Sequence, residues 1–414
     1  MSLRCGPMFI YKVGVVGAGT MGAQIAHVVS HSGLPVILAD TSDAVAKQGV
    51  EAVRSMYQAR VDRGKMTSEQ LEEKLLLVTT SPNLDGLKDV DLVVEAVSED
   101  LKLKQRVFHE LDRVCTQSAI LTTNTSALSI SAIGGATKRP GKVLGLHFFN
   151  PAYAMPLVEI IPGLGTEPRT VDDVVGFAES IRKTPVVVKE CAGFLVNRLL
   201  FPYLNEAVLC VQEGAASIEE IDQEMVSFGM PVGPLTLLDQ VGIDIALEVA
   251  RILHRNYGPR MTPAPLLESL VEAGRVGVKA GHGFYNYLSA EERGRDQSLD
   301  HLLQQVRQHT DHHRAVWTRS RPLFAMINEA VIALQEGVAS ARDIDLAMVA
   351  GTGFPSEKEG PLHVADQIGI DQTLHELESL SQSLGPRFWP APMLRRMVDA
   401  GFTGQIAGRG LFTY

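Results

Sequence analysis

The stretch YKVGVVGAGTMGAQIAHVVSHSGLPVILAD, residues 11–40, decides the fold of the first part of the chain. An apolar run leads directly into Gly17, Gly19 and Gly22, an amphipathic helical pattern follows, and a second apolar run ends on Asp40. A strand, a glycine-rich turn, a helix, a strand and an acidic residue in this order are typical of a dinucleotide-binding βαβ unit. The alternative is a glycine-rich turn that holds no ligand.

Each position of the turn has a physical task. Gly17 permits the tight turn, Gly19 lets the backbone approach a pyrophosphate, and Gly22 lets the helix pack closely on the strand. The pyrophosphate would sit on the helix N-terminus, where free N–H groups favour negative charge. A carboxylate at Asp40 would accept hydrogen bonds from a ribose and repel a 2′-phosphate, so the predicted cofactor is NAD. The predicted cofactor contacts in the turn are Gly17, Ala18, Gly19, Thr20, Met21 and Gly22.

A second decisive stretch is KVLGLHFFNPAYAMPLVEIIP, residues 142–162. Two apolar runs flank a segment with two prolines, which continues neither run, so a hairpin of two buried strands is predicted. Such a hairpin would bring His147 and Glu159 within hydrogen-bonding reach, where a carboxylate fixes the imidazole tautomer and raises its basicity. The alternative is a core histidine paired with a structural glutamate.

Polar residues follow two further predicted strands. In a doubly wound sheet the loops at the carboxyl ends of the strands line the ligand crevice. This places five residues near the nicotinamide half of the cofactor: Glu95, Glu99, Lys104, Asn124 and Ser126. Ser126 could equally be a helix N-cap.

Residues 43–77 are helical in pattern and carry the basic residues Arg54, Arg60, Arg63 and Lys65. Such a run is usually a solvated helix face. The alternative is a contact with a phosphate of a large anionic substrate.

Composition narrows the class of protein. The chain has 414 residues, 45% hydrophobic and 21% charged, with a formal net charge of −10. A globular protein with two or three domains is expected, and general binding to nucleic acid or to an anionic membrane is not. Four widely spaced cysteines indicate reduced thiols, a cytoplasmic location and no metal site. No signal peptide or membrane span is expected.

Six segments, in chain order, closely resemble the L-3-hydroxyacyl-CoA dehydrogenase family: GAGTMG, LVVEAVSEDLKLK, TNTSALSI, HFFNPAYAMPLVEII, GFLVNRLLFPYLNEA and GPLTLLDQVGID. The resemblance covers residues 11–287. It implies oxidation of the 3-hydroxyl of an L-3-hydroxyacyl-CoA by NAD, within fatty acid metabolism and β-oxidation. The individual positions that it assigns are a catalytic pair of His147 and Glu159, with Ser126 and Asn197 bonding the reacting oxygen.

The same resemblance assigns binding residues. Asp40, Glu99, Lys104 and Asn150 would contact NAD, and Lys279 would also reach the cofactor. Arg60 is near a family position that contacts the CoA moiety. General chemistry supports the catalytic roles, because oxidation of an alcohol needs a base for the hydroxyl proton while hydride leaves to nicotinamide.

Beyond residue 319 the chain repeats itself. LNEAV at 204–208 recurs as INEAV at 327–331, and EGAASIEEID at 213–222 recurs as EGVASARDID at 336–345. The second copy has Ser320 where the first has Asn197, and no second nucleotide-binding unit accompanies it. We therefore expect it to be structural. It would replace the dimer partner of shorter family members and permit a monomer.

The expected architecture is α/β, a Rossmann-type doubly wound sheet followed by two tandem all-helical domains. The predicted ranges are 11–188 for the NAD-binding domain, 189–288 for the first helical domain, 289–319 for a connector, and 320–414 for the second copy. The order also resembles the dehydrogenase portion of multifunctional fatty-acid oxidation proteins, without their hydratase portion. Two other functions stay open: a dehydrogenase of free 3-hydroxy acids, and a non-catalytic NAD-binding protein.

Overall fold

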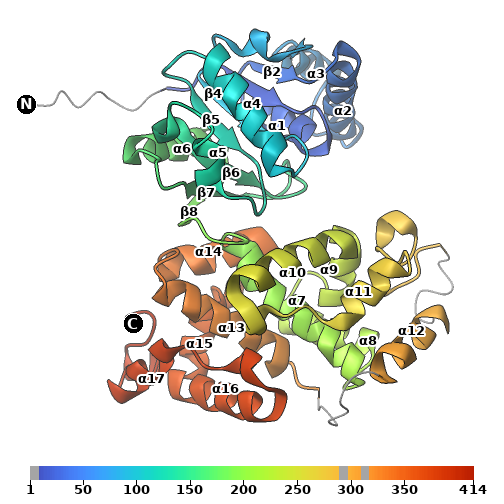
Figure 1. Ribbon diagram of the computed structural model, residues 1–414, viewed down its shortest axis with the longest axis vertical. Coiled ribbons are helices and arrows are strands. Elements are labelled where there is room, and N and C mark those ends of the chain that lie inside the picture. The colour runs from blue at the N-terminus through green and yellow to red at the C-terminus, as the bar shows by residue number, and fades with distance from the viewer. Residues whose placement is uncertain (1–8, 289–296, 309–316) are drawn as a thin grey trace, which may run out of the picture. The chain divides into compact units, whose positions relative to one another are not determined.

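The computed structural model describes residues 9–288, 297–308 and 317–414. It divides into two compact units, Met1–Phe194 and Leu195–Tyr414 (Figure 1). Most of the predicted connector, and Cys5, lie outside the described residues. In the described part, none of the helices combines the length and apolar character needed to cross a membrane.

The first unit is an eight-stranded sheet with helices on both faces (Figure 1). Its strands are β1 (Val13–Val16), β2 (Val36–Ala39), β3 (Val78–Ser81), β4 (Leu92–Glu95), β5 (Ile120–Thr123), β6 (Val143–Phe148), β7 (Leu157–Pro162) and β8 (Thr184–Val187). Its helices are α1 (Thr20–His31), α2 (Asp43–Asp62), α3 (Ser68–Leu75), η1 (Leu84–Leu87), α4 (Leu101–Val114), α5 (Ile130–Gly134), η2 (Pro140–Lys142) and α6 (Pro168–Ser180).

The strand order is β3-β2-β1-β4-β5-β6-β7-β8. Neighbouring strands are parallel from β3 to β6, β7 is antiparallel to β6, and β8 is parallel to β7. The first six strands have the order of a dinucleotide-binding sheet, whose ligand crevice lies where the order reverses, between β1 and β4. The predicted doubly wound sheet is confirmed.

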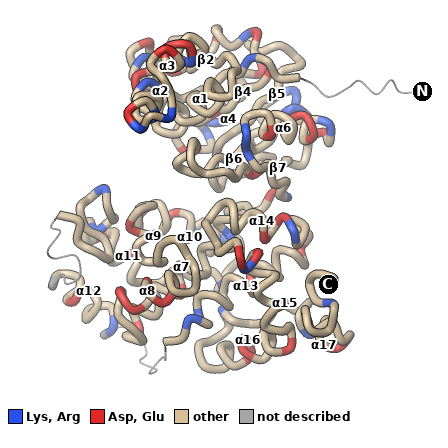
Figure 2. The backbone as a smooth tube through the Cα atoms, turned by 180° about the vertical axis from the view of Figure 1, so that it is seen from behind, with Lys and Arg blue, Asp and Glu red and all other residues tan. Residues whose placement is uncertain are grey.

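Two apolar clusters cover the sheet. One joins α1, α2, α3 and α6 to one face, and the other joins η1, α4 and α5 to the opposite face. The central strands are therefore buried on both sides, which explains why β1, β2 and β4 read as continuous apolar runs and not as alternating patterns. The helices α2 and α3 carry acidic and basic residues in mixture (Figure 2).

The second unit is helical and contains both copies of the repeat. The first copy comprises α7 (Val196–Glu213), α8 (Ile218–Phe228), α9 (Pro234–Val241), α10 (Ile243–Tyr257), η3 (Gly258–Met261), α11 (Pro265–Glu272) and η4 (Val278–Ala280). After α12 (Gln297–Gln308), the second comprises α13 (Ser320–Gln335), α14 (Ala341–Thr352), η5 (Ser356–Lys358), α15 (Pro361–Ile368), α16 (Ile370–Leu384), η6 (Pro386–Phe388), α17 (Pro392–Asp399) and η7 (Gln405–Ala407).

Each element of the first copy has a counterpart in the second, and the second copy has one further element, η5. Equivalent side chains make equivalent contacts: Asn205 accepts from Ala264 N at 2.8 Å, and Asn328 accepts from Ala391 N at 2.9 Å. The two copies form one compact unit, whereas the sequence gives them separate ranges.

The division between the units falls after Phe194, and the predicted range of the first domain ends at residue 188. Residues beyond β8 contact the sheet domain, which explains the difference. Glu190 accepts hydrogen bonds from Ser129 Oγ at 2.8 Å and from Ser131 N at 3.0 Å, at the start of α5.

Candidate active site

The glycine turn between β1 and α1 has the geometry expected for a phosphate cradle. Gly17 has φ +98°, and a Cβ there would lie 2.7 Å from the carbonyl oxygen of Ala96. A Cβ on Gly22 would lie 1.7 Å from the carbonyl oxygen of Gly17, so only glycine allows the helix this close. A Cβ on Gly19 would meet nothing within 4 Å. Open space beside the N-terminus of a long helix fits a pyrophosphate group.

Asp40 follows β2 and faces this turn. Its Oδ2 accepts from Ala18 N at 2.6 Å, and its Oδ1 accepts from Thr41 N at 2.6 Å. The carboxylate is therefore held at the crevice between the first two strands, where a ribose would lie in a dinucleotide-binding sheet. Thr20 and Met21 begin α1 beside it. Their contacts with a cofactor stay predictions.

The strands β6 and β7 form the predicted hairpin, and His147 is directly opposite Glu159 in the register. His147 is 5% exposed and Glu159 is fully buried. Nδ1 of His147 lies 2.8 Å from Oε2 of Glu159. The prediction that the hairpin brings the two side chains into hydrogen-bonding reach is confirmed. Their catalytic roles stay predictions.

The carboxylate determines which imidazole nitrogen carries the proton. An ionised carboxylate has only acceptor sites, so Nδ1 must donate to Glu159, and Nε2 of the neutral ring is then the basic nitrogen. Two phenyl rings flank the imidazole, Phe149 with a centroid distance of 4.5 Å and Phe194 with 5.8 Å. The neutral ring of His147 therefore carries its proton on Nδ1, and it lies in apolar surroundings.

Asn124, directly after β5, is hydrogen-bonded to the end of β6. Its Oδ1 accepts from Phe148 N at 2.8 Å, next to His147. Ser126 N donates to Oε1 of Glu99 at 2.9 Å. The N-cap of α5 is Ser129, whose Oγ accepts from Ala132 N at 3.2 Å. The alternative of a capping role for Ser126 is therefore wrong, and its predicted role at the reacting oxygen stays a prediction.

Glu95 and Lys104 form a buried pair at the end of β4. Lys104 Nζ donates to Glu95 Oε1 at 2.8 Å, and Glu95 also accepts from Thr123 Oγ1 at 2.6 Å. Glu99 lies 3.4 Å from Lys104 and accepts from Thr125 Oγ1 at 2.5 Å. Three residues predicted from one segment, Glu95, Glu99 and Lys104, thus meet in one network with two threonines, one at the end of β5 and one just after it. Glu95 is fully buried, and Glu99 is the most exposed of the three residues. Their contacts with a cofactor stay predictions.

Arg60 lies on α2 in a region rich in positive charge. Its Nε is buried without a hydrogen-bond partner. Burial and the positive charge of Arg60, Lys74 and Arg182 lower the pKa of the neighbouring His31. Positively charged side chains that lie close together favour the binding of an anion. Arg54, Arg63 and Lys65 of the same run are exposed, as expected for a solvated helix face, and only Arg60 is partly buried. A contact of Arg60 with a substrate phosphate stays a prediction.

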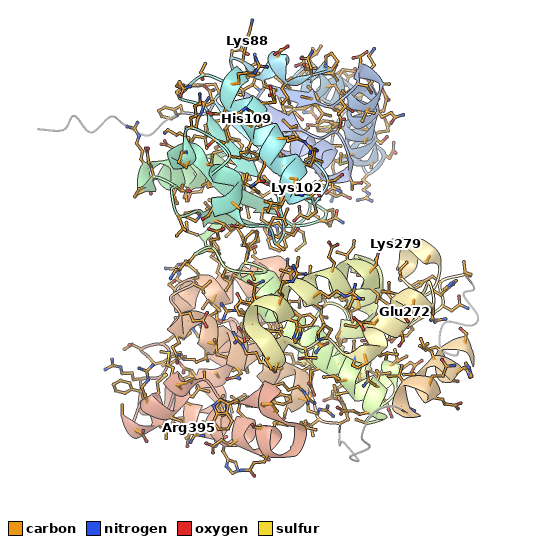
Figure 3. The ribbon with its side chains drawn as sticks, in the orientation of Figure 1. Lys88, Lys102, His109, Glu272, Lys279 and Arg395 are labelled. Atoms are coloured by element: carbon orange, nitrogen blue, oxygen red, sulfur yellow. The ribbon has the colours of Figure 1, made fainter. Side chains whose placement is uncertain are left out.

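In the second unit, Asn197 lies half-buried in the first turn of α7. Lys279, which Figure 3 labels, pairs with Asp244 through Nζ and Oδ2 at 2.6 Å. Asn197 as a donor to the substrate oxygen and Lys279 as a cofactor contact both stay predictions.

The comparisons with known proteins decide the family. Residues 12–191 match the family model of the 3-hydroxyacyl-CoA dehydrogenase, NAD binding domain. Residues 193–287 and 318–414 both match the model of the 3-hydroxyacyl-CoA dehydrogenase, C-terminal domain. The chain belongs to the 3-hydroxyacyl-CoA dehydrogenase family. Its helical repeat is thus two copies of the C-terminal domain of this dehydrogenase family.

Curated relatives from several organisms are named as subunit alpha of a fatty acid oxidation complex. The fatty acid oxidation complex subunit alpha of Shewanella amazonensis is 39% identical over 401 residues, 96% of this chain and 56% of that protein. The chain thus spans about half the length of the curated relatives that it matches.

Among solved structures, the 3-hydroxybutyryl-CoA dehydrogenase of Escherichia coli K12 has a TM-score of 0.85 and 31% identity, covering 95% of this chain and 100% of that one. The (S)-3-hydroxybutyryl-CoA dehydrogenase of Ralstonia eutropha has a TM-score of 0.66 and 38% identity, covering 68% of this chain and 100% of that one.

The dehydrogenase fold also contains a contact that the sequence did not indicate. Gln24, on α1, donates from Nε2 to Asn150 Oδ1 at 3.1 Å and accepts from Ala152 N at 2.6 Å. It ties the loop after His147 to the helix that begins at the glycine turn. The two segments lie more than a hundred positions apart, so no local pattern predicts this contact. The one sign of it in the sequence is a polar residue, Gln24, on the buried side of a predicted helix.

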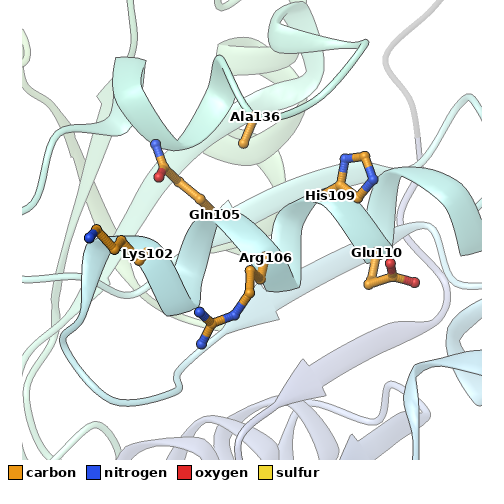
Figure 4. A pocket seen from close by; sticks show the side chains of 6 residues that line it. All are labelled: Lys102, Gln105, Arg106, His109, Glu110 and Ala136. Atoms are coloured by element: carbon orange, nitrogen blue, oxygen red, sulfur yellow. The ribbon is translucent and has the colours of Figure 1, made fainter.

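A pocket on the outer side of α4 does not belong to this site. It is lined by Lys102, Gln105, Arg106, His109, Glu110 and Ala136 (Figure 4). None of the predicted site residues lines it. Among the described residues, no group of three or more His, Cys, Asp and Glu side chains is arranged to hold a metal ion.

Proposed function

We propose that this chain catalyses the reversible, NAD-dependent oxidation of the 3-hydroxyl of an L-3-hydroxyacyl-CoA to 3-oxoacyl-CoA. The observation that carries the proposal is the 2.8 Å contact between Nδ1 of His147 and the buried carboxylate of Glu159. It leaves Nε2 of the imidazole as a base, which oxidation of an alcohol requires. Membership of the dehydrogenase family supports the same activity.

The proposed mechanism assigns one task to each side chain. His147 accepts the hydroxyl proton at Nε2, and the carboxylate of Glu159 offsets the positive charge that develops on the ring. Ser126 and Asn197 donate hydrogen bonds to the substrate oxygen as it becomes a carbonyl. The bound NAD supplies the acceptor for the hydride that leaves the same carbon.

The cofactor contacts proposed for NAD are the turn Gly17 to Gly22, Asp40, Glu95, Glu99, Lys104, Asn124, Asn150 and Lys279. The open space above Gly19 and the position of Asp40 beside Ala18 support this set. A carboxylate at this position binds ribose hydroxyls and repels a 2′-phosphate, which favours NAD over NADP.

We further propose that Arg60 contacts a phosphate of the CoA moiety. A buried Nε without a partner supports this, because a phosphate oxygen would supply the missing acceptor. The positive charges of Lys74 and Arg182 near His31 strengthen the attraction for an anion. An Arg60→Ala variant should therefore raise KM for acyl-CoA substrates and leave KM for NADH unchanged.

We also propose that the protein is a monomer. Arg198 Nε donates to Glu329 Oε1 at 2.7 Å, and its repeat equivalent Arg321 Nε donates to Glu206 Oε1 at 2.9 Å. Glu206 and Glu329 are themselves equivalent in the repeat. Reciprocal contacts of this kind are the mark of a two-fold interface. They support the hypothesis that the second copy occupies the place of a dimer partner, so that the protein is a monomer.

The described cysteines Cys115 and Cys210 are buried thiols that form no disulfide. Free thiols are usual in a reducing compartment. They support the proposed cytoplasmic location.

One assay separates the candidate functions. The purified chain is mixed with NADH and either acetoacetyl-CoA or free acetoacetate, and the absorbance of NADH is followed. The proposal expects turnover of the CoA ester alone. Turnover of free acetoacetate at a similar rate would favour a dehydrogenase of free 3-hydroxy acids, and NADH binding without turnover of either would favour a non-catalytic protein.

A further inference from the structure

Phe194, the last residue of the first unit, has an unusual backbone conformation. Its φ is +50°, in the left-handed region that non-glycine residues rarely adopt. In the described part of the chain, the other non-glycine residues with positive φ are Arg182 and Glu359. A bulky aromatic residue is the least expected of the three at such a position.

The turn around Phe194 holds this conformation in place. Phe194 N donates to the carbonyl oxygen of Cys191 at 3.1 Å, and Cys191 Sγ donates to the carbonyl oxygen of Phe194 at 3.3 Å. Gly193, immediately before it, also has a left-handed φ of +72°. Backbone strain persists only where the surroundings over-determine it, and such residues gather at functional sites.

The side chain of Phe194 explains what the turn achieves. The ring is 1% exposed, and its centroid lies 5.8 Å from that of His147 with an interplanar angle of 60°. Phe149 is the second ring beside the imidazole, at 4.5 Å and 56°. A hydrogen bond from Nδ1 to Glu159 fixes one edge of the imidazole, but by itself it leaves the ring free to tilt about that bond. Two aromatic neighbours restrict the tilt.

We propose that Phe194 is a positioning residue for His147: its ring, held by the left-handed turn, keeps the imidazole in the plane in which Nε2 meets the substrate hydroxyl. The inference rests on the proposed function, because it assumes that His147 is the base. It assigns a task to a residue in the chain segment that joins the two units. Misplacement of a reacting group by about 1 Å costs on the order of 100-fold in rate.

The test is a Phe194→Leu variant of the full chain, with Phe177→Leu as the matched control. Phe177 lies on α6, is 3% exposed and has no part in the site. For Phe194→Leu we expect kcat to fall roughly 10-fold to 100-fold, with KM for acetoacetyl-CoA and the Kd of NADH unchanged. The proton-transfer and hydride-transfer steps would then limit the rate, so the primary isotope effect with 3-deuterated substrate in the oxidative direction should rise.

A Phe194→Gly variant separates positioning from folding. Glycine adopts φ +50° without strain, so this variant should bind NADH normally while its kcat falls at least as far as that of Phe194→Leu. The inference is overturned if either variant keeps the wild-type kcat, or if the loss matches that of Phe177→Leu with an unchanged isotope effect. A His147→Gln variant is assayed alongside. If the His147→Gln variant stays active, the proposed function fails. If His147→Gln is inactive but the Phe194 variants keep the wild-type kcat, only the positioning role of Phe194 is refuted.

Discussion

Two histidines of the first unit have opposite environments. His147 donates from Nδ1 to the buried carboxylate of Glu159. His27, on α1, is 3% exposed and neither of its ring nitrogens has a hydrogen-bond partner. A partner carboxylate stabilises a protonated ring, while burial among apolar and cationic groups opposes one. The first environment orients the ring, and the second keeps the ring of His27 neutral.

A Glu159→Gln variant should lose most of its activity. The amide keeps the size of the side chain but cannot offset the positive charge of the imidazole, and its NH₂ group can select the wrong tautomer. We expect kcat to fall by roughly 10²-fold to 10⁴-fold, measured with acetoacetyl-CoA and NADH. NADH binding followed by fluorescence should be unchanged, and a variant with near wild-type kcat would contradict the assigned pairing.

A His27→Gln variant should make stability less dependent on pH. Burial, followed by the positive charges of His31, Arg60 and Lys183, lowers the pKa of His27 to about 3, below its ordinary value of 6.5. Between these two values the unfolded chain binds a proton that the folded protein does not, so stability falls as pH drops below 6.5.

Linkage predicts that His27 removes about 2 kcal/mol of stability between pH 7 and pH 5. Urea unfolding at the two pH values measures it: the wild type should lose about that much more than His27→Gln. Equal losses in the two proteins would show that His27 is protonated in the folded state.

At the scale of elements, the turn between β1 and α1 shows two different reasons for glycine. Gly22 is needed by the fold, because a Cβ there would overlap the carbonyl oxygen of Gly17. Gly19 is not needed by the fold, because a Cβ there would meet nothing within 4 Å. Gly19 leaves open space that no other residue of the protein fills, as expected where the backbone approaches a ligand closely.

The pair Gly19→Ala and Gly22→Ala tests this distinction. Gly19→Ala should unfold at the wild-type urea concentration and yet bind NADH more weakly, because its methyl group fills the space for the pyrophosphate. Gly22→Ala should lose both stability and binding, since the helix must move away from the strand. Calorimetry of NADH binding and urea unfolding give the two readouts. Tight NADH binding by Gly19→Ala would argue against a cofactor pyrophosphate at this turn.

At the scale of the whole molecule, the second helical unit depends on ion pairs between its two copies. Arg198 is fully buried, and Glu329 accepts from it at 2.7 Å and from Arg260 Nε at 3.2 Å. The equivalent carboxylate of the first copy, Glu206, accepts from Arg321 at 2.9 Å and from Arg387 Nε at 2.8 Å. Each copy thus provides the counter-charges for the buried arginine of the other.

Glu329→Gln should destabilise the protein by up to about 3–5 kcal/mol, because the buried Arg198 then keeps only a partly exposed partner, Glu336 at 2.8 Å, as its counter-charge. Glu206→Gln should cause a similar loss of stability, because Glu206 pairs with the buried Arg321 in the equivalent way. Glu268→Gln is the control, since its pair with Arg251 is about half exposed and should matter little. Urea unfolding measures all three. A small loss for either buried glutamate would mean that the contact between the copies does not depend on these charges.

Sedimentation tests the proposed monomer. If the second copy covers the face that a dimer partner would occupy, the chain should sediment with the mass of one chain across a wide range of concentration. A stable dimer built through residues 190–285 would refute the proposal. The measurement is independent of enzymatic activity.

Local sequence determined much of this protein. The order of strand, glycines, helix and Asp40 indicated the dinucleotide-binding sheet because these features lie next to one another in the chain, and regular spacing revealed the repeat. The hairpin indicated the contact of His147 with Glu159 because the two residues lie on adjoining strands. Short separation along the chain made the sheet and the hairpin predictable, and similarity between two distant segments made the repeat predictable.

Only the tertiary structure decided the contacts between distant segments. It brought Gln24 to the loop at Asn150, the ring of Phe194 to His147, and Arg198 to Glu329. It also assigned the capping of α5 to Ser129 and left His27 without a hydrogen-bond partner. The physical reason is that such contacts depend on how strands and helices pack in space, and no local pattern of apolar or polar residues encodes the orientation of a side chain toward a partner far along the chain.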